Sequence, residues 1–531
     1  MIALNNRKCK GKWKYFSYNR CVDSNKVISQ FSLLYDIISS DYKKGRRTWA
    51  EYTRLSRRFI SDIAIFNSWS NPYSSNRTME REKLGSRLGF IFLSAGCAIG
   101  IGNVWRFPYI AGMYGGGVFV LFYLFFLIIM GVPVMTMEFA VGRASRKSII
   151  KSFQELEKPG QKWHFNGYLG MAGNYLLMMF YTTVTGWMLY YFYQMLTGKF
   201  QGKNTEQVGE MFQDMLSSPQ ILSGTMIIIV VAGIFICSIG LQKGVEKVTK
   251  IMMSLLLAII IILAIHSLTL ENSLEGLKFY LLPDFQRMQE VGVWETITAA
   301  MNQAFFTLSL GIGAMGIFGS YIGKDRSLFG ESVHIAILDT FVALVSGLII
   351  FPTCSSFDIS PDKGPSLIFI TLPNIFNGMK GGRIWGTLFF VFMTFAAFST
   401  ILAVFENIIS CGMDLFHWNR KTSCLINLVV IIILSLPCVF GYNLWSGFQP
   451  LGEGSAVLDL EDFIVSNLIL PIGSFCYLIF CVTRFGWGFE NYRKEANTGN
   501  GMKLPGWIRP YVTFILPALL FFLIIKGLLG N

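Results

Sequence analysis

Two glycine-rich runs interrupt otherwise apolar segments of the sequence, and their backbone groups could bind small charged ligands. The first run covers residues 96–103 and the second covers residues 307–313. Glycine is the poorest helix former after proline, so each run should break a helix and free backbone N–H and C=O groups. Free carbonyl groups favour a cation, and free amides favour a carboxylate. The side chains of Asn103, Thr307 and Asp339 add oxygen atoms that a small cation could use.

The segments that carry these residues are apolar enough to cross a membrane. Of 531 residues, 53% are hydrophobic and 15% are charged, whereas a soluble domain carries about 25% charged residues. Apolar runs of about 20 residues cross about 30 Å of hydrocarbon as helices. The sequence therefore predicts an all-α membrane protein with eleven transmembrane helices, near residues 88–112, 117–142, 167–197, 220–240, 245–270, 298–322, 332–353, 385–413, 422–441, 456–483 and 508–528.

The two interrupted spans are the first and the sixth, which predicts an inverted 5+5 repeat. We expect one transmembrane domain over 79–531, with repeat one near 86–270, repeat two near 298–483 and an extra helix near 508–528. Broken helices at matched positions of two repeats are typical of a transporter binding site at the middle of the membrane. Close helix packing through small residues is the alternative explanation of each glycine run.

The distribution of charge indicates topology rather than nucleic-acid binding. Of the net charge of +13, residues 1–78 contribute +10, from 15 Lys+Arg and 5 Asp+Glu. We interpret this basic N-terminal extension as a disordered tail or a mis-set start upstream of Met79. It could also lie on an anionic membrane surface. With a cytoplasmic N-terminus, the inner loops of the eleven spans hold 18 Lys+Arg and the outer segments hold 8. This asymmetry predicts a multi-pass cell-membrane protein with an extracytoplasmic C-terminus.

Several ionisable residues are predicted to lie inside the membrane, where such side chains are usually functional. Glu138 and Glu406 could brace helices. Arg106 should lie about one turn outside the first break, with Asp462 as an available partner. The sequence contains neither a nucleophile–base pair nor a metal-ligand cluster, so we expect no enzyme activity and no cofactor.

The residues around the first break resemble a known family signature. Arg87-Leu88-Gly89-Phe90, followed by the sequence from Gly100 to Tyr109, resembles the first-helix motif of the neurotransmitter:sodium symporter family. The resemblance extends from about Met79 to the end of the tenth span, and eleven spans are similar to the prokaryotic amino-acid branch. Further matching motifs are Gly115-Gly116-Gly117, Gly142-Arg143, Gln303, Phe305-Phe306-Thr307-Leu308-Ser309 and the loop from Gly364-Pro365-Ser366 to Leu372-Pro373-Asn374.

This resemblance implies the leucine-transporter fold and two sodium ions as co-transported ligands. Sodium site one would use Ala98, Asn103, Thr307, Asp339 and the substrate carboxylate. Sodium site two would use Gly96, Ile99, Ala396, Ser399 and Thr400.

The resemblance also implies an amino acid as the substrate. Relatives that carry monoamines have an Asp where this chain has Gly100, so the substrate would supply its own carboxylate. That carboxylate would meet the amides of Ile101 and Gly102 and the hydroxyl of Tyr181. The mainly apolar pocket favours a neutral, hydrophobic or aromatic side chain. The implied substrate site comprises Cys97, Ala98, Gly100, Ile101, Gly102, Leu177, Tyr181, Phe306, Ser309, Ile312, Thr400 and Val404.

Two gates follow from the same resemblance. The outer gate would comprise Arg106, Asp462, Tyr181 and Phe306, and the inner gate would comprise Arg81, Tyr321 and Asp414.

Two departures from the family pattern accompany these gates. Leu84 replaces the usual Trp beside the inner gate, so inner closure could differ in detail. Asp339 replaces a frequent Asn, and its charge predicts transport that is independent of chloride.

The implied mechanism is sodium-coupled symport by alternating access between the two sides of the membrane. A proton-coupled carrier that titrates Asp339 or Glu138 is one alternative. A substrate-sensing receptor or a channel on the same scaffold is another. The sequence leaves the identity of the amino acid, the ion stoichiometry and the oligomeric state open.

Overall fold

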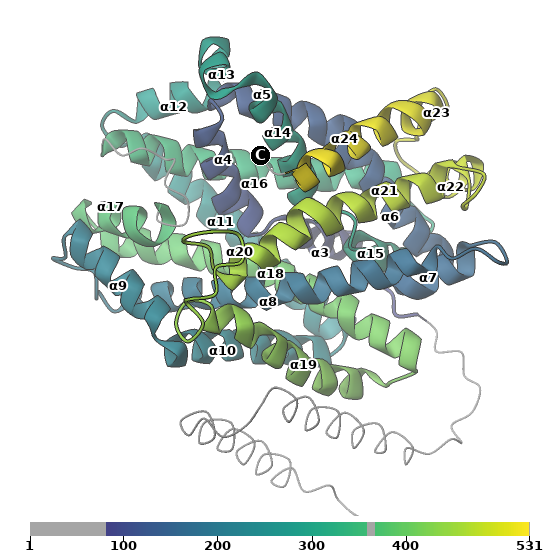
Figure 1. The fold of residues 1–531 in the computed structure, drawn as a ribbon, viewed down its shortest axis with the longest axis horizontal. Coiled ribbons are helices and arrows are strands. Elements are labelled where there is room, and N and C mark those ends of the chain that lie inside the picture. The colour runs from purple at the N-terminus through teal and green to yellow at the C-terminus, as the bar shows by residue number, and fades with distance from the viewer. Residues whose placement is uncertain (1–80, 358–366, 530–531) are drawn as a thin grey trace, which may run out of the picture. The chain divides into compact units, whose positions relative to one another are not determined.

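The computed structural model describes residues 81–357 and 367–529, and these residues fold into an all-helical bundle (Figure 1). The expectation for residues 1–78 lies outside the described residues, as does the motif Gly364-Pro365-Ser366.

Eight helices are long and apolar enough to cross a membrane in the described part of the chain. Their composition identifies a multi-pass membrane protein. Several contain short π-helical turns, labelled η. The eight spans are Gly117–Ser145, Pro219–Ser238, Leu241–Leu268, Leu328–Ser356, Gly382–Phe416, Arg420–Phe440, Val457–Val482 and Ile508–Leu528.

The first predicted span is a bent pair of helical segments. Helix α3 (Arg87–Ala98) and the segment Gly102–Met113 meet at an angle of 56°. The Ser86 side chain accepts a hydrogen bond from the backbone N–H of Gly89 and caps the start of α3. The helix ends at Ile99, whose ψ of 96° is extended rather than helical. The glycine-rich run therefore breaks this span as the sequence predicts. The second segment is formed by η1 (Gly102–Arg106) and α4 (Phe107–Met113).

The sixth predicted span is also interrupted. Helix α14 (Val293–Phe306) and helix α15 (Ala314–Tyr321) are separated by seven turn residues, 307–313. Within this turn Ser309, Gly311 and Gly313 have positive φ angles. These left-handed conformations cannot continue a right-handed helix, so the backbone must leave the helical path.

The predicted count of eleven spans stays a prediction. With the bent pair, the described residues give up to nine spans by length and composition. The third predicted span is α8 (His164–Leu196), which has 33 residues and is therefore about 50 Å long. Helix α8 is less uniformly apolar than the eight helices named above. The sixth span consists of two helices that are each too short to cross alone.

The broken helices are enclosed by longer ones. Helix α18 (Gly382–Phe416) packs against both α8 and α3, and α15 packs against α6 (Val132–Ser145). A Cβ atom built on Gly142 of α6 would lie 1.7 Å from the carbonyl oxygen of Gly316. Glycine is thus required where α6 and α15 touch through their backbones.

Shorter helices and the remaining segments complete the bundle. Their bounds are α5 (Gly117–Phe126), η2 (Leu127–Gly131), α7 (Ile149–Leu156), α9 (Thr205–Ser217), α10 (Pro219–Ser238), η3 (Leu241–Glu246), α11 (Lys247–Leu268), α12 (Ser273–Leu281), α13 (Phe285–Val291), α16 (Leu328–Ser356), η4 (Leu367–Thr371), α17 (Leu372–Gly378), α19 (Arg420–Phe440), α20 (Val457–Phe463), η5 (Ile464–Ile469), α21 (Leu470–Val482), α22 (Phe489–Ala496), α23 (Ile508–Pro510), η6 (Tyr511–Ile515) and α24 (Leu516–Leu529).

Candidate functional site

One cluster of buried oxygen atoms lies where the two broken spans meet α16. The Asp339 carboxylate accepts hydrogen bonds from the Asn103 amide at 2.8 Å and from the Thr307 hydroxyl at 2.9 Å. The Asn103 side-chain oxygen in turn accepts the backbone N–H of Gly100 at 3.3 Å. The structure thus brings together three of the four residues expected at sodium site one. The fourth, Ala98, lines the adjacent cavity.

A second cluster joins α18 to the end of α3. The Ser399 hydroxyl lies 3.0 Å from the carbonyl oxygen of Gly96, 2.8 Å from that of Ala396 and 3.4 Å from that of Ile99. The Thr400 hydroxyl lies 3.1 Å from the Gly96 carbonyl and 3.5 Å from the Ile99 carbonyl. All five residues expected at sodium site two therefore converge. The Gly96 and Ile99 carbonyls come from the end of α3, where carbonyl groups lack helical partners, and the Ala396 carbonyl comes from α18.

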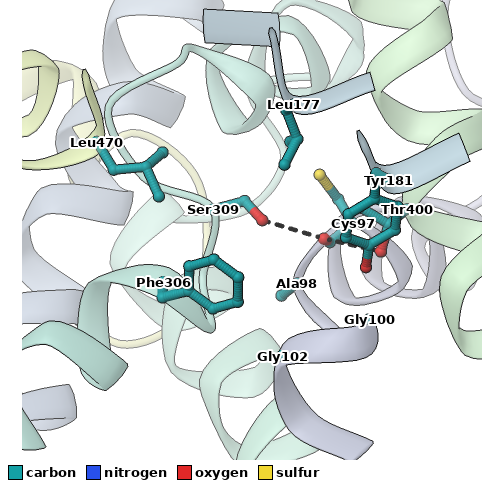
Figure 2. A pocket seen from close by; sticks show the side chains of 10 residues that line it. All are labelled: Cys97, Ala98, Gly100, Gly102, Leu177, Tyr181, Phe306, Ser309, Thr400 and Leu470. Atoms are coloured by element: carbon teal, nitrogen blue, oxygen red, sulfur yellow. Dashed lines mark hydrogen bonds between the residues drawn. The ribbon is translucent and has the colours of Figure 1, made fainter. Parts of the chain in front are cut away.

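A small cavity lies between the two broken spans (Figure 2). Its volume is about 20 Å³, enough for about one water molecule, so an amino acid needs the surrounding side chains to move. Figure 2 places Phe306 and Leu470 on one side and Tyr181 and Thr400 on the other. The lining residues are Cys97, Ala98, Gly100, Gly102, Leu177, Tyr181, Phe306, Ser309, Thr400 and Leu470.

Three of the expected substrate residues do not line this cavity. The backbone N–H of Ile101 is nevertheless at its wall, because it donates to the Tyr181 hydroxyl at 2.8 Å. Ile312 and Val404 are fully buried and are not among the lining residues. The Ile312 side chain lies against Gly173 of α8, where its Cγ2 atom is 2.8 Å from a Cβ built on that glycine.

Two glycines of the first break are required by close side-chain contacts. A Cβ atom on Gly100 would lie 2.1 Å from the Tyr181 hydroxyl and 2.6 Å from the Thr400 hydroxyl. A Cβ atom on Gly102 would lie 2.7 Å from the Phe306 ring. Side chains at these positions would therefore occupy the space in which the polar and aromatic walls of the cavity meet.

A charged pair lies beside Phe306, one of the residues that line the cavity. The Arg106 guanidinium lies 3.9 Å from the Asp462 carboxylate and 4.1 Å from the centroid of the Phe306 ring. Ser466 connects the two charges, since it accepts from Arg106 at 3.2 Å and donates to Asp462 at 2.6 Å. Of the four residues expected at the outer gate, Tyr181 and Phe306 line the cavity, and Arg106 and Asp462 connect to it through the Phe306 ring.

The residues expected at the inner gate also meet. Arg81 pairs with Asp414 at 3.0 Å, and its guanidinium lies 4.9 Å from the centroid of the Tyr321 ring. The Asp414 carboxylate also accepts the backbone N–H of Ser148 at 2.6 Å. Leu84, which replaces the family's usual Trp, donates its backbone N–H to the Tyr321 carbonyl at 3.4 Å.

Two buried glutamates fix the helices around the site. Glu138 of α6 accepts the backbone N–H of Gly311 at 2.5 Å and so holds the turn that interrupts the sixth span. Glu406 of α18 pairs with Arg420 at 2.7 Å and accepts the Tyr321 hydroxyl at 2.7 Å. Both contacts agree with the bracing expected from the sequence.

Sequence reasoning missed Leu470, Ser466 and Arg420. Ser466 and Leu470 follow Asp462 by four and eight residues, a spacing that puts helical residues on one face, so the pattern could have indicated them. Arg420 begins α19 but lies two residues before the predicted span 422–441, because a predicted helix start is uncertain by a few residues.

The chain forms a helical membrane bundle with two interrupted spans, two clusters of polar groups and a small cavity between the interruptions. These features are typical of a carrier for small solutes and ions. A sequence model described as the Sodium:neurotransmitter symporter family matches residues 81–214 and 204–530. The chain belongs to this family, whose members are sodium-coupled transporters rather than enzymes.

Individual relatives agree with this assignment. A sodium-dependent transporter of Bacillus subtilis, YhdH, is 32% identical over 395 residues, which cover 74% of this chain and 86% of the relative. The sodium-dependent serotonin transporter of Drosophila melanogaster is 26% identical and matches 85% of this chain and 77% of its own length. The crystal structure of MhsT in complex with L-phenylalanine superimposes with a TM-score of 0.75 at 34% identity, covering 84% of this chain and 100% of that chain.

Proposed function

We propose that this sodium symporter imports a neutral, hydrophobic or aromatic amino acid. The observation that carries the proposal is the composition of the central cavity. Its side-chain walls include Leu177, Phe306 and Leu470, and it has no charged side chain in its lining. A basic or acidic substrate side chain would therefore be buried without a partner. The L-phenylalanine complex of MhsT supports the same substrate class.

The substrate carboxylate would bind at the first break. Gly100 carries no acidic side chain that could repel it, and the amides of Ile101 and Gly102 and the Tyr181 hydroxyl are donors next to the cavity. The Ile101 amide now donates to Tyr181, so the carboxylate would insert into this bond.

Two sodium ions would bind together with the substrate. Asn103, Thr307 and Asp339 supply oxygen atoms for the first ion, together with the Ala98 carbonyl and the substrate carboxylate. The second ion would take the hydroxyl and carbonyl oxygens of the Ser399 cluster. Sharing the carboxylate between substrate and the first ion would couple amino-acid binding to sodium.

Transport would proceed by alternating access. The first ten of the eleven spans would form two inverted repeats of five, and one bundle would rock against the rest. The Arg106–Asp462 and Arg81–Asp414 pairs would open in turn on the outer and inner sides. Each net charge that moves inward contributes about 2.3 kcal/mol per 100 mV of membrane potential.

Uptake into liposomes tests this proposal. The purified protein should bind one or more hydrophobic amino acids in a thermal-shift screen of the twenty amino acids only when sodium is present. It should also accumulate the labelled hit against its gradient when sodium is outside. Replacement of sodium by choline at fixed pH should abolish uptake. Uptake that instead follows a proton gradient would favour a proton-coupled carrier, and binding without uptake would favour a sensor.

A further inference from the structure

Four large apolar side chains are exposed on the loop that connects α19 to α20. They lie within eight consecutive residues, and each keeps about half of its surface exposed. Large apolar side chains that gather on a surface mark a place of interaction with a partner or a membrane. The four side chains, called the loop patch below, are Leu444 (57% exposed), Trp445 (43%), Phe448 (54%) and Leu451 (48%).

The backbone of this loop is held in place by hydrogen bonds. The Trp445 N–H donates to the Phe440 carbonyl at 2.8 Å, and the Phe448 N–H donates to the Trp445 carbonyl at 2.8 Å. The Asn443 side chain donates to the Leu216 carbonyl at the end of α9, at 3.0 Å. The loop patch therefore projects from an ordered turn, in which part of the backbone already has hydrogen-bond partners.

The loop continues an uncharged stretch of sequence that begins inside the membrane span. Residues 422–452 contain no Asp, Glu, Lys, Arg or His. Helix α19 has 21 residues, so it is about 30 Å long and matches the thickness of the hydrocarbon core. Its end at Phe440 therefore lies near the boundary of the membrane, and the uncharged loop follows directly at that level.

The surface next to the loop patch is the lipid-facing side of two membrane spans. Helices α10 and α19 pack against each other, and both are apolar enough to cross a membrane. Large exposed side chains on them are Ile228 and Phe235 of α10 and Leu425 and Ile433 of α19. The loop patch extends this apolar surface past the end of α19. Its Trp445 is of a residue type that is enriched at membrane boundaries, because the indole ring is apolar and its N–H is polar.

We propose that the loop patch is an interfacial anchor, which inserts into the phospholipid boundary at this end of α19. Its partner is the glycerol and upper acyl-chain region of one leaflet. The anchor has a consequence for the neighbouring helix. Helix α20 begins at Val457, six residues after Leu451, and carries Asp462. An anchored loop therefore fixes to the bilayer the chain segment that leads into the Arg106–Asp462 pair.

Spin labels on the full-length protein in phosphatidylcholine–phosphatidylglycerol liposomes test the proposal. Phe448→Cys carries the label in the loop patch, and Glu453→Cys carries it at an exposed acid of the same loop. Oxygen concentrates in lipid and a nickel chelate stays in water, so the ratio of their collision rates measures depth. The ratio at 448 should exceed the ratio at 453 several-fold and approach that of Ile433→Cys on the lipid-facing side of α19.

Two further measurements complete the design. Labelling of the unmodified protein gives the background signal of its native cysteines, to be subtracted. Leu444→Cys is a second reporter in the loop patch and should behave like Phe448→Cys, so the test remains valid if one variant does not fold.

Two results would overturn the anchor. Ratios at 444 and 448 as low as the ratio at 453 would mean that the loop patch faces water. Loss of access to both reagents would mean that protein covers it, and spin–spin broadening that disappears on dilution with unlabelled protein would identify a second copy of the chain as the cover. The measurement requires no transport, so either result would leave the proposed function intact.

Discussion

The Asn103 amide and the Asp339 carboxylate form a buried hydrogen bond of 2.8 Å between residues that are 236 positions apart in the chain. The bond joins the first broken span to α16, and Thr307 adds the second broken span through its own bond of 2.9 Å to the same carboxylate. Three separate segments thus bring the Asn103 amide, the Thr307 hydroxyl and the Asp339 carboxylate to one point. Rigid placement of several oxygen atoms is what binding of a small cation requires.

Replacement of Asn103 or Thr307 by Ala should weaken sodium-dependent binding of the amino acid. A hydrogen bond to a charged group contributes about 1.5–3 kcal/mol, so sodium affinity should fall by about 10- to 100-fold. Sodium titrations of the substrate-induced thermal shift measure this change. Asn427→Ala removes another buried Asn, one that accepts from Tyr175 at 2.6 Å, and should lower stability without changing sodium affinity. Unchanged sodium affinity in both site variants would contradict the assigned ion site.

Transport should be independent of chloride, because the Asp339 charge lies within the cluster that would bind sodium. Uptake should be the same in chloride and in gluconate. Asp339→Asn keeps the shape of the side chain and removes the charge, so residual uptake by this variant should be stimulated by chloride. Strong stimulation of the unmodified protein by chloride would refute the prediction.

Gly100→Ala should reduce substrate affinity. The added Cβ would lie 2.1 Å from the Tyr181 hydroxyl and would displace it from its bond to the Ile101 amide. Overpacking of this kind costs about 1–3 kcal/mol, which corresponds to a loss of about tenfold or more in affinity. Gly224→Ala provides the control, since a Cβ there meets nothing within 4 Å and the residue is helical. That variant should be stabilised by about 1 kcal/mol in unfolding measurements. Equal substrate affinity in the two variants would rule out the tight fit at Gly100.

The sequence could predict the parts of the site that depend on local chemistry. Glycine runs that break helices, and Asn103 beside the first of them, follow from backbone propensity and ligand type. The pairing of Ser399 with carbonyl groups of α3 came from the family resemblance, and the structure brings these groups within 3.5 Å. Leu470 could not be placed in the same way, because packing decides which of several buried apolar residues reaches the cavity.

The substrate side chain should be selected partly by Leu470. Leu470→Ala enlarges the cavity, so affinity for a small aliphatic amino acid should fall while a large aromatic one is retained or improved. A methylene contact in an apolar pocket contributes about 1–3 kcal/mol, so the preference for L-phenylalanine over L-valine should rise by about tenfold. Competition binding measures the ratio. Ile469→Ala changes the preceding buried residue, which does not line the cavity, and should leave the ratio unchanged. A shift of equal size in both variants would indicate a general loss of packing.

The Glu406–Arg420 pair should contribute to stability rather than to binding. Arg420→Ala leaves the fully buried Glu406 without the partner that it contacts at 2.7 Å. Loss of one member of a buried ion pair costs about 3–5 kcal/mol, mainly because the other charge stays behind. Thermal unfolding in detergent should therefore show a large decrease in Tm. The double variant Arg420→Ala with Glu406→Gln removes the stranded charge and should recover much of the loss, since the neutral amide can still accept from Tyr321. If the two substitutions are additive, the pair does not act as a unit and this explanation of the buried glutamate fails.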